Sequence, residues 1–447
     1  MSVPDTARAA TGRATVRELL AHRDLRTLLA SQWVAQAADG LAQAAFAEAL
    51  ILGPLGEAGT PGRILVVFAI TLIPYSLLAP VLGVFVDRWR RRELMVTANL
   101  ARAALLVTLP LWAELLPRDA GLYTGVLVVL GLGRLFLVTK GAVLPVVLEE
   151  HHLLRGNALS GGGGMIAALL GGVAGVGVVG WLGPRPSFAA AGIAYAVAAV
   201  VARRISRPFA HPRPPDETVR AAAARVFGEL LQGVGEIARR PRARLPLIAI
   251  FLLRTVGMIV AIAAILVIKS EFPEAGDRFG RLSASALALG SAGAGAFLGA
   301  VTAPLIGRRL AKPGLVVAGF VVSGVGVAVL AGLRSIPAVL VLTAIGGYGG
   351  FLTKVAVDAQ VQEALPDEYR GRAFSLYDIL YNLASVAAAG VMVLGEDVRL
   401  RPLFVATGAV TLVLAGAFGH AMKRAGMPLA RGRPRPDARE KRRTAAR

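Results

Sequence analysis

The sequence Gly83-Val84-Phe85-Val86-Asp87-Arg88-Trp89-Arg90-Arg91-Arg92 is a short, strongly charged stretch between two long apolar runs. From residue 64 up to Val86 the chain carries no charge, and residues 94–112 carry only Arg102. Each run reaches about 20 residues, the length that an apolar helix needs to cross about 30 Å of hydrocarbon. The stretch therefore predicts a tight loop between two transmembrane helices.

The composition of the whole chain predicts an integral membrane protein. Of its 447 residues, 55% are hydrophobic and 17% are charged, which is more apolar material than one soluble core uses. The formal charge of +21 does not indicate nucleic-acid binding, because the arginines lie in loops and tails and not on a basic face with interleaved aromatic residues. The lack of cysteine excludes disulfides, thiolate metal sites and cysteine nucleophiles.

Apolar runs separated by charged loops predict an all-α fold with twelve transmembrane helices. The expected spans are approximately residues 28–52, 63–86, 94–112, 122–148, 158–182, 188–202, 245–268, 284–306, 314–333, 336–361, 373–394 and 403–422. Lys and Arg cluster in residues 88–92, 203–244 and 308–312 and again from residue 423 onward, and short cytoplasmic loops retain such residues during insertion. Both termini are therefore expected in the cytoplasm.

Changes in composition along the chain predict two bundles of six helices. Residues 27–204 and 244–424 form the bundles, and residues 205–243 form a cytoplasmic linker. Within the linker, residues 219–239 have the pattern of an amphipathic helix that lies on the membrane surface. The basic segments 1–26 and 425–447 are expected to be a cytoplasmic lead-in and a disordered tail.

An internal repeat relates the two bundles. The sequence Arg-Gly-Asn-Ala-Leu-Ser at residues 155–160 recurs as Arg-Gly-Arg-Ala-Phe-Ser at residues 370–375, and Thr139-Lys140 recurs as Thr353-Lys354 at almost the same offset. A duplicated six-helix unit in parallel orientation explains these similarities. Transporters with such repeats bind substrate between the halves near the middle of the bilayer.

These features together resemble the major facilitator superfamily of transporters. Its signature between helices two and three is similar to Gly83, Asp87-Arg88 and the following basic residues, with Arg90 in place of the usual glycine. Residues 32–40, 144–159 and 366–372 resemble the drug:proton antiporter branch that includes macrolide and siderophore exporters. The glycine-rich segment 167–175 has glycine where the antiporter signature has proline.

Charged residues inside spans are candidate functional residues because each is costly to insert. Asp39 lies near the middle of the first span and is the candidate proton carrier, with a fixed salt bridge as the alternative interpretation. Arg254 occupies the equivalent position in the second half, so an ion pair with Asp39 across the pseudo-twofold axis is one expectation. Arg134 is similar to an arginine that the superfamily associates with proton handling.

The substrate is expected to be anionic or zwitterionic. The predicted cavity holds Asp39, Arg134, Lys140, Arg254, Lys354 and Asp358, in which cations outnumber acids. Asp358 lies four residues after Lys354, where it can neutralise the lysine on the same helix face. Lys140 and Lys354 either contact substrate or extend toward the lipid headgroups.

A second set of residues is expected to control gating, namely Gly83, Asp87, Arg88, Arg91, Arg92, Arg372 and Asp378. The resemblance implies that Asp87 docks at the start of the eleventh helix, near Arg372. Arg102 and Asp378 are expected to serve helix packing and gating. The second half has Ala303 near the position of Asp87, so only the first copy keeps the acid.

The sequence thus predicts a secondary transporter in the inner membrane of a prokaryote, which exports an amphipathic drug or metabolite against proton entry by alternating access. A lysophospholipid carrier and a non-transporting receptor or scaffold remain as alternatives. An enzyme is not expected, because no nucleophile, zinc or paired-carboxylate motif is present. The five histidines lack metal-ligand spacing, so no metal or cofactor is expected. The expected partners are protons, lipids and a small molecule, with the protein as a monomer.

Overall fold

The computed structural model describes residues 16–52, 61–73, 82, 86, 89–116, 120–149, 152–206, 218–272, 284–330, 332, 335–365, 367–394 and 400–430. Over these residues the fold is helical, and the β-type pairing is confined to an isolated bridge between Leu310 and Ala430. The all-α expectation is therefore confirmed for this part of the chain.

Long helices follow one another along the chain with short connections. The first half contains α1 (Val16–Ala21), α2 (Arg23–Ala47), the π-helical turn η3 (Glu48–Leu52), α3 (Pro61–Ile73), α5 (Arg91–Leu115), α6 (Ala120–Val147), α7 (Leu153–Leu182) and α8 (Pro184–Arg203). The second half contains α9 (Val219–Arg239), α10 (Pro241–Glu271), α12 (Ala284–Ile306), α13 (Lys312–Leu330), α14 (Ile336–Ala364), α15 (Asp367–Leu394) and α16 (Leu400–Arg424).

Many of these helices are suited to a bilayer. Within the described ranges, nine are long and apolar enough to cross a membrane, and α12 adds a shorter apolar run, Gly290–Ile306. Large apolar side chains such as Leu170, Trp181 and Val413 are exposed on the outside of the bundle, where lipid would cover them. The protein is a multi-pass membrane protein, and the predicted count of twelve spans stays a prediction.

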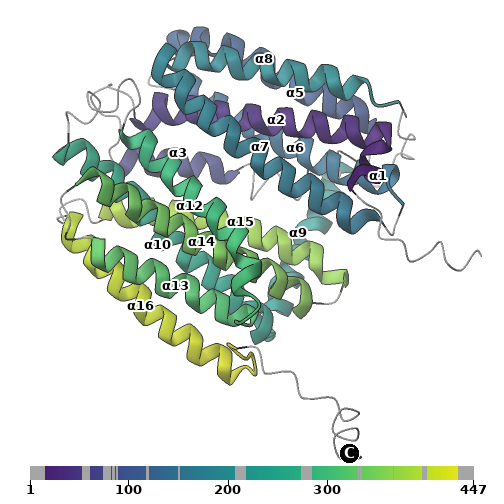
Figure 1. Ribbon diagram of the computed structural model, residues 1–447. Coiled ribbons are helices and arrows are strands. Elements are labelled where there is room, and N and C mark those ends of the chain that lie inside the picture. Colours follow the sequence, from purple (N-terminus) through teal and green to yellow (C-terminus); the bar gives the residue numbers. More distant parts are fainter. Residues whose placement is uncertain are drawn as a thin grey trace, which may run out of the picture.

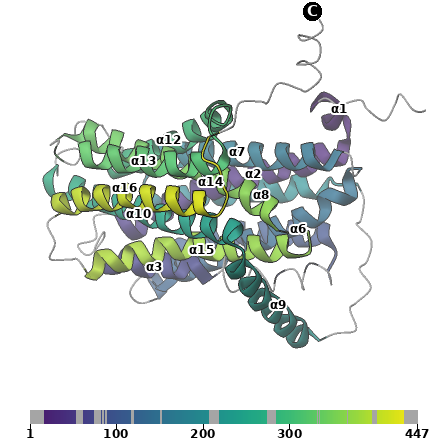
Figure 2. The ribbon, with the colours of Figure 1, turned by 90° about the horizontal axis from the view of Figure 1, so that it is seen from below.

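The helices form two groups that lie side by side (Figure 1). In the first half α2 packs against α7 and α8, and α5 packs against α6 and α8. In the second half α14 packs against α10, α12 and α13. The two groups meet where α3 runs along α15 and where α7 approaches α12. Figure 2 shows α1 and α9 at the same end of the bundle, which we call the terminal end.

Glycines let several of these helices approach closely. A Cβ atom at Gly171 of α7 would lie 2.0 Å from the Ala37 carbonyl oxygen of α2, and one at Gly295 of α12 would lie 1.8 Å from the Ala344 carbonyl oxygen of α14. No side chain fits at such distances, so these backbones are in direct contact. Gly171 and Gly295 are therefore packing positions, between α2 and α7 and between α12 and α14.

The hydrophobic core differs between the halves. One cluster of buried apolar side chains fills the first half and includes Phe136. The second half has two clusters, one toward the terminal end with Leu253 and Leu352, and one toward the opposite end with Val260 and Leu342. The core of the second half is therefore interrupted near the middle of α10 and α14.

Candidate functional site

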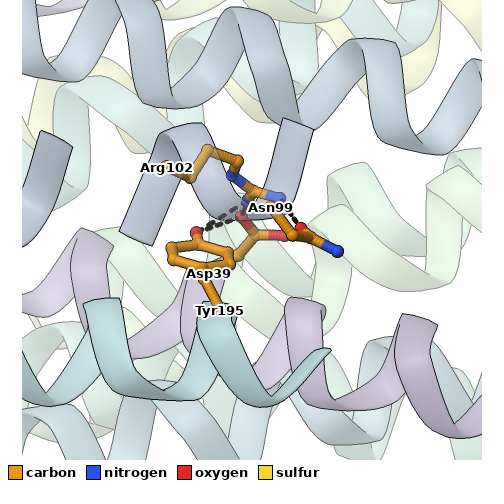
Figure 3. Close-up of polar contacts among 4 residues, drawn as sticks. All are labelled: Asp39, Asn99, Arg102 and Tyr195. Atoms are coloured by element: carbon orange, nitrogen blue, oxygen red, sulfur yellow. Dashed lines mark hydrogen bonds and ion pairs between the residues drawn. The ribbon is translucent and has the colours of Figure 1, made fainter. Parts of the chain in front are cut away.

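A buried ion pair lies inside the first half. Asp39 of α2 forms a salt bridge with Arg102 of α5, and the Tyr195 hydroxyl of α8 donates a hydrogen bond of 2.6 Å to the Asp39 carboxylate (Figure 3). The Arg102 guanidinium also donates to the Tyr195 hydroxyl at 2.7 Å and to the Asn99 side-chain carbonyl at 3.1 Å. Three helices thus meet at this carboxylate, which α2 carries and to which α5 and α8 each supply one donor.

The two members of this pair differ in their exposure. The Arg102 side chain is fully buried, whereas the Asp39 side chain is 21% exposed. Gly133 of α6 packs closely against the pair, since an added Cβ atom would lie in a tight contact of 3.1 Å with Arg102 Nη2 and an ordinary one of 3.7 Å with Asp39 Oδ1. The Asp39 carboxylate is therefore partly accessible, and the Arg102 guanidinium binds it from the buried side.

The expected ion pair between Asp39 and Arg254 is wrong. Arg254 of α10 lies instead over the ring of Tyr381 of α15, with 4.3 Å between Arg254 Cζ and the ring centroid. Asp39 turns into its own half because Arg102 lies there as a fully buried cation that needs an anion. Within the described residues Arg254 has no carboxylate partner, and its buried Nε has no hydrogen-bond partner.

One ion pair joins the two halves directly. Arg134 of α6 forms a salt bridge with Asp378 of α15. Their side chains are 21% and 34% exposed, so both border the space between the halves. The sequence placed Arg134 with proton handling and Asp378 with gating, and the structure brings the two residues together.

The two lysines have different surroundings. Lys354 pairs with Asp358 at 2.8 Å on the same face of α14, as their spacing predicts. Lys140 donates a hydrogen bond of 2.8 Å to the Ser160 hydroxyl of α7, which in turn donates to the Gln32 side chain of α2 at 2.7 Å. Lys140 is therefore held by neutral groups within the first half.

The charged motif that organises the sequence is described only in part. Gly83, Asp87 and Arg88 lie outside the described residues, and for Arg372 only the backbone, in α15, is described. Arg91 donates to the Ala142 carbonyl oxygen at 2.9 Å, and Arg92 donates to the Ile205 carbonyl oxygen at 3.2 Å. These two arginines connect the start of α5 to α6 and to the segment that follows α8, and their gating role stays a prediction.

Adjoining cavities lie between the halves. A cavity of about 280 Å³ is lined by Asp39 and Tyr195 from the first half and by Asn382 from the second. It shares Gln43 and Phe68 with a cavity of about 400 Å³ whose lining is mostly apolar. The partly exposed edge of Asp39 thus faces a space that both halves enclose.

The sequence model of the Major Facilitator Superfamily matches residues 28–389. The chain belongs to this superfamily. Transporters of the MFS type from Mycobacterium bovis and Mycobacterium tuberculosis are each 30% identical to it over 416 residues, which cover 91% of this chain and 92% of theirs. These relatives and the fold support a role in membrane transport.

Solved structures share the fold. A POT family transporter in complex with 5-aminolevulinic acid superposes with a TM-score of 0.70 at 13% identity, covering 90% of this chain and 96% of that one. The nucleoside transporter NupG superposes with a TM-score of 0.64 at 12% identity, covering 90% of this chain and 99% of the other. At such identities the similarity shows the superfamily fold alone.

The sequence did not predict which residues of this transporter neutralise Arg102 and accept its hydrogen bonds. It indicated a packing role for Arg102 and did not point to Tyr195 or Asn99. One signal was available, because Arg102 is the only charge in its span and an unpaired cation there is costly. Asp39 is an acid of the same half at a comparable depth, so depth makes it a candidate partner, whereas the rotation of α2 that brings the two side chains together is seen only in the structure.

Proposed function

We propose that this transporter couples proton entry to the export of an amphipathic small molecule, with Asp39 as the proton carrier. The observation that carries the proposal is the position of the Asp39 carboxylate, which is 21% exposed to a cavity that both halves line while it is paired with a fully buried arginine. A carboxylate in such a place gains or loses a proton as its access to water alternates.

The geometry suggests how protonation acts on the helices. A protonated Asp39 no longer neutralises Arg102, and the buried cation then relies on Tyr195 and Asn99 alone. Because an uncompensated buried charge is costly, protonation favours a rearrangement of α2, α5 and α8 that gives Arg102 a new environment. Since α2 lines the cavity between the halves, this rearrangement changes access to that cavity.

The ion pair between Arg134 and Asp378 connects the protonation of Asp39 to the movement of the two halves. It joins α6 to α15 across the interface, so it exists only while those helices are in contact. In alternating access the halves rock against each other, and such a pair forms in one state and breaks in the other. The proposed location is the inner membrane of a prokaryote, with export toward the outside.

The test is transport into liposomes with an imposed pH gradient, using a panel of anionic, zwitterionic and cationic amphiphiles that includes a lysophospholipid. Gradient-driven accumulation and exchange without a gradient are measured for the wild type and Asp39→Asn. We expect the variant to lose accumulation and to keep exchange, which also shows that it is folded. Glu114→Gln, which removes an exposed carboxylate paired with Arg185, is the matched control.

Two results contradict the proposal. Accumulation by the wild type that is indifferent to the pH gradient rules out proton coupling. Unchanged gradient-driven accumulation in Asp39→Asn removes Asp39 as the essential proton carrier. Selective movement of the lysophospholipid alone favours the lipid-carrier alternative.

A further inference from the structure

The break in the core of the second half is a cavity of about 270 Å³. It lies between the two hydrophobic clusters, at the level where α10 passes from Leu253 to Val260. Arg254 of α10 and Tyr381 of α15 line it together with residues of α12 and α14. Among the described residues the first half has a single cluster, and the Asp39 and Arg102 pair contacts Tyr195 of that cluster. The second half thus keeps a space at the depth where the first half has an ion pair.

Glycines keep this space open. A Cβ atom added at Gly257, Gly346 or Gly350 would meet no other atom within 4 Å, and all three residues line the cavity. Gly347 differs, because its Cβ atom would lie 2.0 Å from the Ala292 carbonyl oxygen of α12. Gly347 is therefore needed for helix packing, whereas the other three glycines leave room for a ligand.

Arg254 supplies a cation to this cavity. Its guanidinium is held over the Tyr381 ring at 4.3 Å, and its Nε has no hydrogen-bond partner among the described residues. The other arginines of the candidate site are neutralised, Arg102 by Asp39 and Arg134 by Asp378. An arginine inside a membrane protein without an acid is costly, and an anion that enters the cavity removes that cost. The planar guanidinium matches a carboxylate, which accepts two parallel hydrogen bonds from it.

The cavity continues into apolar space. It shares Met258, Ala261 and Gly293 with the mostly apolar cavity of about 400 Å³ between the halves. A ligand with its charged group at Arg254 therefore has room for an apolar body along α10 and toward α2 and α7. The described residues that line this cavity include no carboxylate for a cationic headgroup.

We propose that Arg254, stacked on Tyr381, binds the carboxylate of an amphipathic monoanion whose apolar body occupies the cavity between the halves. The proposal rests on the proposed function, because it names the substrate class that the same cavities admit. The two equivalent positions of the repeat then have different roles. Asp39 carries the proton and Arg254 recognises the substrate.

The first experiment measures equilibrium binding of radiolabelled 4-phenylbutyrate to the purified protein without a pH gradient, in competition with 4-phenylbutyramide and 4-phenylbutylamine. We expect the carboxylate to compete best. Arg254→Gln should weaken its binding roughly ten- to a hundredfold and abolish the preference over the amide. Arg254→Lys keeps the charge but loses the planar stack, so it should retain part of the preference.

A second pair of variants separates filling of the cavity from general damage. Gly346→Leu places a side chain in the cavity and should weaken 4-phenylbutyrate binding. Gly416→Leu is the matched control, because Gly416 is exposed on α16 and its added Cβ atom would also meet nothing within 4 Å. Both variants should keep the unfolding temperature of the wild type. Equal binding by both variants overturns the proposal.

The outcomes distinguish this site from the proposed function. If carboxylate binding depends on Arg254 but transport does not respond to a pH gradient, the binding site is supported and only the proposal of proton coupling is refuted. An unchanged preference in Arg254→Gln, equal binding of the amine by the wild type, or no saturable 4-phenylbutyrate binding overturns the site. Each of these three results is compatible with proton-driven transport of other compounds, so the proposed function would survive the loss of the site.

Discussion

Arg134 of α6 and Asp378 of α15 lie 244 residues apart in the chain and form an ion pair that bridges the two halves of the protein. The other ion pairs of the candidate site, Asp39 with Arg102 and Lys354 with Asp358, each lie within one half. The bridging pair is therefore the one whose formation depends directly on how the halves are positioned. Substitution of this pair therefore tests the proposed rocking movement of the halves.

Substitution of Arg134 or Asp378 should change the rate of exchange across the membrane. Because the pair is partly exposed, its loss is worth about 0.5–1 kcal/mol, or roughly a two- to fivefold change in the ratio of the two conformations. Arg134→Ala and Asp378→Ala should show this change in exchange assays, and the double swap Arg134→Asp with Asp378→Arg should restore much of the wild-type rate. A swap that is worse than either single variant argues against a direct pair.

A branched side chain at Gly133 should crowd Arg102, because even a Cβ atom there would lie 3.1 Å from Arg102 Nη2. Gly133→Val should cost about 1–3 kcal/mol through overpacking and lower the unfolding temperature in detergent. Gly141→Val on the same helix is the control, since a Cβ atom there would meet nothing within 4 Å. Equal thermal stability of the two variants contradicts the role assigned to Gly133.

The buried pair of Asp39 and Arg102 should respond unequally to removal of its members. Asp39→Ala leaves a fully buried cation and should destabilise the fold by about 3 kcal/mol, whereas Arg102→Met leaves a carboxylate that is 21% exposed and should cost less. The double variant should be more stable than Asp39→Ala alone. Thermal unfolding of the three variants gives the coupling free energy, and simple additivity of the two single effects contradicts this account.

Helix α9 should lie against the membrane surface. Phe227, Leu231 and Val234 are exposed at helical spacing on one face, and such a face is suited to the boundary between headgroups and acyl chains. The chain has no native cysteine, so a fluorophore can be attached at Leu231→Cys or at Gln232→Cys, which lies off this face. Nitroxide lipids should quench the label at residue 231 more strongly. Equal quenching at both positions places α9 away from the bilayer.

Local spacing predicted the interactions that lie within one helix. Lys354 and Asp358 are four residues apart, and the helix periodicity alone brings them together at 2.8 Å. That prediction needed no knowledge of which helices are neighbours.

Pairings between helices did not follow from spacing. The repeat placed Asp39 and Arg254 at equivalent positions and suggested a pair between them, yet Asp39 binds Arg102 and Arg254 stacks on Tyr381. Equivalence under a repeat fixes the depth of a residue in the bilayer but not its rotation about the helix axis. Rotation is set by packing, and in the first half it turns Asp39 toward α5 and α8.

The sequence by itself determined that the chain is a helical membrane protein with a superfamily signature, and its internal repetition predicts two related halves, because hydrophobicity over the length of a span, charge in the loops and repetition are properties of the chain order. Only the tertiary structure decided which charges are neutralised and where a cavity remains whose arginine has no acid partner among the described residues. Those depend on side chains from helices that are far apart in the chain, such as α6 and α15, meeting at one depth and facing one another.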